Sequence, residues 1–110
     1  MIVITSSEIV GQEITHTLGM VRGTTVRARH IGSDILAWLR NLVGGEVIEY
    51  TKILAESREQ ALDRMIEEAK LLHADAIVST RFSTSNIANG AAEVMVYGTA
   101  VKTKDIEPGN

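Results

Sequence analysis

The stretch TKILAESREQALDRMIEEAKLL, residues 51–72, decides the fold predicted for this chain. Its apolar residues recur at spacings of three and four, which places them on one side of an α-helix, while charged residues occupy the other side. At about 1.5 Å per residue the helix is roughly 30 Å long, nearly the width of a compact domain of this size. We take Thr51 as its N-cap. The apolar stripe consists of Leu54, Ala61, Leu62, Met65, Ile66, Ala69 and Leu72.

The composition limits the kind of protein. A chain of 110 residues suits one domain, which we place at residues 1–104, followed by a frayed polar tail at 105–110. Because there is no cysteine, disulfides, thiolate nucleophiles and cysteine-ligated metals are excluded. The net charge of -3 argues against nucleic acid and membrane surfaces as partners. With no leader and no membrane-spanning run in the sequence, we expect a cytoplasmic protein.

Two stretches before the long helix are predicted as strands. MIVIT at residues 1–5 forms a short one. A long alternation then starts at Glu13 and is interrupted at residues 22–24, where we favour a bend or bulge in one ribbon over a hairpin reversal, which stays open as the alternative. Between this ribbon and the long helix, residues 33–43 are predicted as a short amphipathic helix with Ser33 as N-cap. One face of the ribbon is apolar and carries Ile14, Leu18, Met20, Val26 and Ala28.

Two more strands are predicted after the long helix, from Ala76 to near Asn86 and from Ala92 to Lys102. Asn89-Gly90 between them is typical of a two-residue hairpin, although Ile87-Ala88 ahead of it allows a longer connection. The resulting order of strand, helices, strand and strand is a βαββ unit with its last two strands antiparallel, which predicts an α+β fold.

The last strand is apolar on both faces, with Val94, Val96 and Ala100 on one and Met95, Tyr97 and Val101 on the other. Gly98 in its middle would let another backbone come close. Three strands and one helix leave two strand edges and one sheet face uncovered. We therefore predict that copies of the chain cover one another in a homo-oligomer. The alternative is a monomer in which MIVIT and the short helix cover the open face.

The run from Gly19 to Phe82, with VGGE at 43–46, ADAIV at 74–78 and GTAV at 98–101, resembles the YbjQ-like family of small bacterial proteins, which carries a heavy-metal-binding label. The resemblance implies a dodecin-like βαββ subunit that assembles into a homopentameric ring. It implies no activity. His73 stands where the family commonly has glycine, at a position that often adopts positive φ, which histidine takes only with strain.

Little in the sequence points to catalysis, to a cofactor or to a metal. None of His16, His30 and His73 is paired with another ligand at a helical spacing, so we predict no transition-metal site. His16 lies on the apolar parity of the long ribbon, which predicts a packed or interfacial histidine. Ser79, Ser83 and Ser85 are interpreted as the polar side of a strand, since no G-x-S-x-G motif accompanies them.

Arg58 is the polar residue of most interest, because it falls where the apolar stripe of the long helix should continue. It could pair with Glu46 or Glu93 at a subunit contact. Alternatively, it could hold a small anion between subunits with help from Arg27, Arg29 or Arg81. The sequence thus favours a non-enzymatic oligomeric binding or scaffold protein. The rival is an enzyme whose site forms between subunits from Arg58 and a carboxylate.

Overall fold

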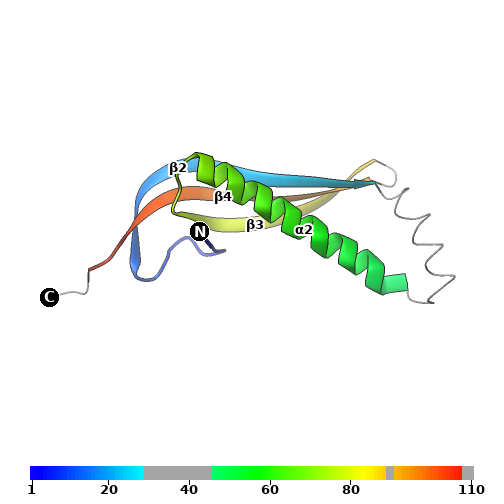
Figure 1. The fold of residues 1–110 in the computed structure, drawn as a ribbon, viewed down its shortest axis with the longest axis horizontal. Coiled ribbons are helices and arrows are strands. Elements are labelled where there is room, and N and C mark those ends of the chain that lie inside the picture. The colour runs from blue at the N-terminus through cyan, green and yellow to red at the C-terminus, as the bar shows by residue number, and fades with distance from the viewer. Residues whose placement is uncertain (29–45, 89–90, 108–110) are drawn as a thin grey trace.

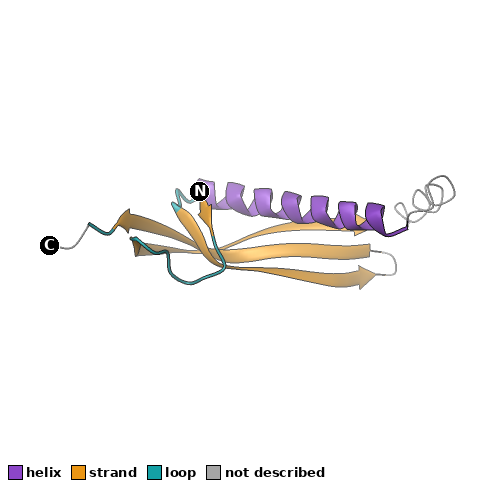
Figure 2. Ribbon diagram, turned by 90° about the horizontal axis from the view of Figure 1, so that it is seen from below, coloured by secondary structure: helices purple, strands orange, loops and turns teal. Residues whose placement is uncertain are grey.

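The computed structural model describes residues 1–28, 46–88 and 91–107, and side chains within residues 1–26, 55–85 and 92–107. The described chain is an α+β fold in which one helix lies along one face of a four-stranded sheet (Figures 1 and 2). The strand order across the sheet is β1-β3-β4-β2. The elements are β1 (Ile2–Val3), β2 (Gln12–Ala28), α2 (Glu46–Leu71), β3 (Ala76–Ala88) and β4 (Ala91–Asp105).

The pairing of the strands follows the predicted order. β1 pairs with β3 in parallel, and β4 pairs in antiparallel with both β3 and β2. β3 ends at Ala88 and β4 begins at Ala91, and these two residues are paired, so the connection spans two positions and the longer alternative is wrong. The predicted short helix at 33–43 lies outside the described residues.

The long helix starts earlier than predicted. α2 begins at Glu46, so Thr51 lies inside the helix and is not its N-cap. Residues 46–50 contain neither glycine nor proline, and Glu46 and Glu49 complement the positive end of the helix dipole, so nothing in this segment prevents helix formation. The helix ends at Leu71, one residue before the predicted end.

The exit from α2 is a Schellman motif centred on His73. The amide of Ala74 donates to the carbonyl of Ala69 at 3.1 Å, and the amide of His73 donates to the carbonyl of Lys70 at 3.0 Å. His73 itself has a φ of 59°, as its place after the helix predicted. Ala74 packs on the same core cluster as Ala69, which is the apolar contact that accompanies this motif.

The long ribbon is a single strand, which excludes the hairpin reversal. Its irregularities fall between Ile14 and His16 and between Thr17 and Gly19, and not at 22–24. Each adds one residue to β2, so the second restores the alternation that the first disturbs. The first irregularity also explains why His16 is exposed in the single chain, so of the two predicted positions the packed one is wrong and the interfacial one stays a prediction. Its Nδ1 lies 3.0 Å from the Thr15 hydroxyl.

The helix packs on the face of β2 that was predicted to be polar. Val21, Gly23 and Thr25 are buried under α2, whereas Met20 is 65% exposed and Val26 is 57% exposed on the opposite face. The predicted apolar face is therefore divided: Leu18 packs on the cluster under α2, Ile14 packs on the opposite face, and the helix leaves Met20 and Val26 uncovered. The reason is the shape of the strand at Gly23, because only a surface without a side chain lets the helix backbone approach closely.

The contact at Gly23 shows how close this approach is. A Cβ placed on Gly23 would lie 1.8 Å from the carbonyl oxygen of Ala61 and 2.7 Å from the amide nitrogen of Met65. The buried side of α2 is a row at four-residue spacing, Ser57, Ala61, Met65 and Ala69. Nearby, the buried Thr25 hydroxyl donates to the Ser57 carbonyl at 3.0 Å.

The apolar core forms two clusters on opposite faces of the sheet. The larger lies under α2 and joins Met65 and Ala69 to Ile77, Val96 and Ala100. The smaller contains Ala76, Val78 and Val101 and is covered by the segment between β1 and β2 through Ile4, Ile9 and Ile14. This segment covers only one end of the sheet.

The strands are long for a domain of this size. The 17 residues of β2 extend over roughly 56 Å at the usual rise of a strand, against about 30 Å across a small compact domain. The chain measures 66 × 25 × 18 Å along its principal axes. β4 continues through Asp105, and the amide of Ile106 donates to the carbonyl of Gly11 at 2.9 Å.

Candidate functional site

The open face is the part of the sheet that faces away from α2 and lies beyond the segment between β1 and β2. The register pairs Arg22 with Tyr97 and Thr24 with Met95, so these residues share a face with the exposed Met20 and Val26. Met95 and Tyr97 are half-buried. The open face is therefore a mixed strip on a central and an edge strand. Its apolar and aromatic members are Met20, Val26, Met95 and Tyr97, and its polar members are Arg22, Thr24 and Glu93.

Arg81 lies at the side of this face on β3, opposite Tyr97 in the register. Its Nη1 donates to the carbonyls of Thr5 and Thr80, both at 2.8 Å. These bonds attach the chain after β1 to the irregular part of β3, where Ser79 has a φ of 54°. Arg81 thus holds the N-terminal segment in place, although its side chain remains exposed.

Arg58 lies on α2, on the other side of the sheet from Arg81. The buried row of the helix passes through Ser57, so the prediction that Arg58 interrupts the apolar stripe is wrong. Arg58 is exposed, and the described residues give it neither a hydrogen bond nor an ion pair. A single chain therefore does not bring Arg58 and Arg81 together.

The other predicted ligand residues cannot be placed. Arg29 lies outside the described residues, and the side chains of Arg27 and Glu46 do as well, although β2 and α2 include their backbones. Glu93 is half-buried on β4 and pairs with Val26 in the register, which places it on the side of the sheet opposite α2. Glu93 and Arg58 are thus on different sides of the sheet.

Sequence reasoning missed the role of Arg64. Its Nη1 donates to the carbonyl of Thr24, a group on the outer edge of β2. The helix residue Arg64 therefore occupies one of the backbone acceptors of this edge. The sequence contains a signal for this role of Arg64. Arg64 lies three residues after the buried Ala61, and residues at that spacing are neighbours on the helix surface, so its side chain starts beside the sheet.

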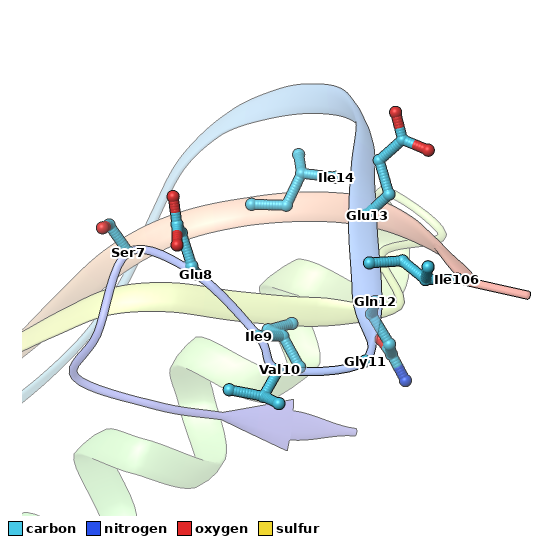
Figure 3. Close-up of a pocket in the computed structure, with 9 residues that line it drawn as sticks. All are labelled: Ser7, Glu8, Ile9, Val10, Gly11, Gln12, Glu13, Ile14 and Ile106. Atoms are coloured by element: carbon cyan, nitrogen blue, oxygen red, sulfur yellow. The ribbon is translucent and has the colours of Figure 1, made fainter. Parts of the chain in front are cut away.

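A hollow of about 690 Å³ lies at the end of the molecule where the segment before β2 turns into the strand. Figure 3 shows its lining side chains, which come from residues 7–14 and from Ile106 after β4. Glu13 at its rim forms an ion pair with Lys104 at 3.4 Å. Ser7 shares this lining with the carboxylates Glu8 and Glu13, but among the described residues no hydrogen bond joins its hydroxyl to either of them, as a nucleophilic serine and its base would require.

The described residues do not fit a heavy-metal site. No three of their histidine, aspartate and glutamate side chains are grouped so as to hold an ion. The sequence also lacks the thiolates that soft metals prefer. His16 and His73 are exposed and lie on different elements, His16 on β2 and His73 after α2. His30 lies outside the described residues.

Comparison with known proteins identifies the family. The model of the family described as "Putative heavy-metal-binding", YbjQ_1, matches residues 1–104. The chain belongs to the YbjQ-like family. A UPF0145 protein of Methanosarcina acetivorans is 55% identical to it over 102 residues, covering 93% of this chain and 96% of the relative. Another from Acinetobacter baylyi is 59% identical over 91 residues, covering 83% and 84%.

These relatives correct one expectation and leave the activity open. The YbjQ-like family is not restricted to bacteria, because Methanosarcina acetivorans is an archaeon. Among solved structures, a protein of unknown function from Pediococcus pentosaceus, assigned to the DUF74 family, has a TM-score of 0.64 at 19% identity. That likeness covers 94% of this chain and 98% of the other and supports the fold alone. In the described part of this YbjQ-like chain, no helix is both long and apolar enough to cross a membrane.

Proposed function

We propose that this protein acts as a homo-oligomeric binding or scaffold protein, a dodecin-like subunit in a pentameric ring, without chemistry of its own. The observation that carries the proposal is the open face. Met20 and Val26 are more than half exposed on this face, and Met95 and Tyr97 beside them are half-buried. Apolar side chains on both faces of a sheet need a covering layer on each, and the described chain supplies one helix.

The size of the exposed surface supports the same proposal. The chain exposes 7683 Å², against about 6,000 Å² expected for a folded monomer of 12.0 kDa. The excess of roughly 1,700 Å² reflects the elongated shape and includes the more than half exposed side chains of Met20, Val26 and Phe82, which neighbouring copies would cover. A member of a closed ring uses two surfaces, one toward each neighbour. The pentameric copy number comes from the resemblance to the YbjQ-like family.

Native mass spectrometry of the purified protein tests the proposal, because it gives the copy number and the mass of any retained ligand together. We expect a pentamer. The variant Met20→Glu places a charge on the open face and should raise the concentration at which the oligomer dissociates by about tenfold or more, which corresponds to 1.4 kcal/mol. Val10→Glu is the matched control, because Val10 is fully exposed at the hollow and outside the open face. A wild-type chain that stays monomeric at every concentration contradicts the proposal.

The exposure of Arg58 favours one second candidate, the binding of a small anion between subunits. An arginine on an exposed helix side with no partner among the described residues is free to bind a carboxylate or phosphate. Titration calorimetry with inorganic phosphate tests this on the assembled protein. Arg58→Gln should abolish the binding heat, whereas Arg64→Gln, which removes the cation already bonded to Thr24, should leave it unchanged. An unchanged heat in Arg58→Gln excludes the site.

A further inference from the structure

The two outer edges of the sheet differ in how well they are protected. The β2 edge carries two irregularities, and Arg64 of α2 binds the outward carbonyl of Thr24. On the other edge, β1 pairs with β3 only at Ala76 and Ile77, and hydrogen bonds from the following chain reach no further than Thr80. From Phe82 to Ala88, β3 has no neighbour on this side among the described residues.

The backbone groups that face this open edge can be assigned from the ladder. The carbonyl of Ile77 accepts a bond from Ile4, so Ile77 points its backbone groups outward, away from β4. The carbonyl of Thr24 likewise points outward from β2, so its neighbours Gly23 and Thr25 bond β4. Their partners there are Val96 and Val94, which means that even-numbered residues of β4 bond β2 and odd-numbered residues bond β3. Phe82 and Thr84 are paired with Val96 and Val94, both even-numbered. Their amides and carbonyls therefore face the open edge.

The side chains along this edge do not protect it. The sequence from 82 to 88 is FSTSNIA, with no charged residue and no proline, which are the usual means of preventing strand addition. Phe82 is 51% exposed and lies on the helix side of the sheet, where α2 contacts mainly β2 and β4. Such an edge combines unpaired backbone groups with an apolar anchor.

We infer that the free edge of β3 from Phe82 to Ala88 pairs with a strand of a second copy of this chain, and that Phe82 is buried at that contact. The inference rests on the proposed function and adds its geometry. Apolar side chains on the open face supply area, whereas backbone bonds at the β3 edge fix the register of one copy against the next. A second copy is the occupant because each copy exposes apolar side chains in two places, as a member of a closed ring does. One place is the open face with Met20 and Val26, and the other is the β3 edge with Phe82.

Proline at position 84 tests the edge directly. Thr84→Pro removes an amide that faces away from β4, so it should leave the β3–β4 ladder intact and block the added strand. Thr84→Ala is the matched control, since it removes the same side chain and keeps the amide. By analytical ultracentrifugation, Thr84→Pro should dissociate at a concentration at least about tenfold higher than Thr84→Ala, which equals 1.4 kcal/mol. Equal dissociation of the two variants overturns the inference.

A second pair of variants is independent of proline. Phe82→Ser should weaken the assembly, and Phe82→Leu should restore most of it, because leucine still buries apolar surface. If circular dichroism shows that Thr84→Pro has unfolded, this pair decides, and equal assembly of Phe82→Ser and wild type overturns the inference. Hydrogen exchange adds a direct measurement, since the Thr84 amide should be protected in the assembly and lose that protection on dilution. A monomeric wild type refutes the proposed function, whereas a wild-type oligomer unaffected by these variants refutes only the β3 contact.

Discussion

At the scale of single residues, two positions set the geometry of α2. His73 ends the helix in the left-handed region, where a Cβ costs about 1–2 kcal/mol. Gly23 receives the helix backbone at a distance that no side chain permits. His73 could be recognised from the sequence because it follows the last turn of a predicted helix. The role of Gly23 could not, because it depends on where the helix lies across the strand.

Replacing His73 with glycine is expected to stabilise the protein. His73→Gly relieves the strain at φ 59° but gives the unfolded chain more freedom, so the net gain should be about 0.5–1 kcal/mol. Urea denaturation measures it. His73→Ala serves as the control, because it removes the imidazole and keeps the Cβ. A gain in the alanine variant as large as in the glycine variant would mean that the imidazole, and not the backbone, is unfavourable.

Substitution of Gly23 should have the opposite effect. In Gly23→Ala the new Cβ meets the backbone of Ala61, which cannot rotate away, so α2 must shift and the free energy of unfolding should fall by about 3 kcal/mol. Thermal unfolding followed by circular dichroism measures the loss. Thr17→Ala on the same strand, an exposed position outside the open face, is the comparison and should change stability far less. If Gly23→Ala were as stable as wild type, the close packing of α2 on β2 would be wrong.

At the scale of elements, the junction of α2 and β2 combines a close backbone contact with polar bonds. The buried hydroxyl of Thr25 donates to the carbonyl of Ser57, and the guanidinium of Arg64 donates to the carbonyl of Thr24. This junction explains why the helix selects the face of β2 with Gly23 and Thr25. The larger apolar side chains of Met20 and Val26 would hold the helix away from the strand.

Removing the Thr25 hydroxyl tests the polar part of this junction. Thr25→Val keeps the shape of the side chain and removes the donor, so it should cost about 1 kcal/mol, the net value of one such bond. Thr17→Val is the control, because it makes the same change on β2 at an exposed position outside the open face. Guanidinium denaturation of both variants gives the comparison. Equal stabilities of the two variants would show that the Thr25 bond contributes nothing.

At the scale of the whole molecule, an elongated chain gains stability from association. Its radius of gyration is 18.3 Å, against about 13 Å for a compact domain of this length. If neighbours bury the open face, the folded state is favoured by mass action, and the unfolding temperature should rise with protein concentration. Differential scanning calorimetry over a hundredfold concentration range measures this. An unfolding temperature independent of concentration would indicate that the folded chain is stable alone.

The heavy-metal label of the family leads to a separate prediction for the whole molecule. Because the described residues gather no ligand set, equilibrium dialysis against zinc should show no stoichiometric binding. The variant His16→Ala should behave like wild type, since His16 is exposed and contacts only Thr15 among the described residues. Stoichiometric zinc that disappears in His16→Ala would require a site assembled from several copies.

The sequence by itself determined the elements of this protein, because helical spacing, strand alternation and the Asn89-Gly90 turn are local patterns that a few neighbouring residues decide. The long helix, the single long ribbon and the two-residue hairpin follow from them, whereas the strain at His73 was implied by the resemblance to a family that commonly has glycine there. Only the tertiary structure decided which face of β2 the helix covers. That choice depends on the contact between Gly23 and Ala61, and it leaves Met20 and Val26 of the predicted apolar face uncovered.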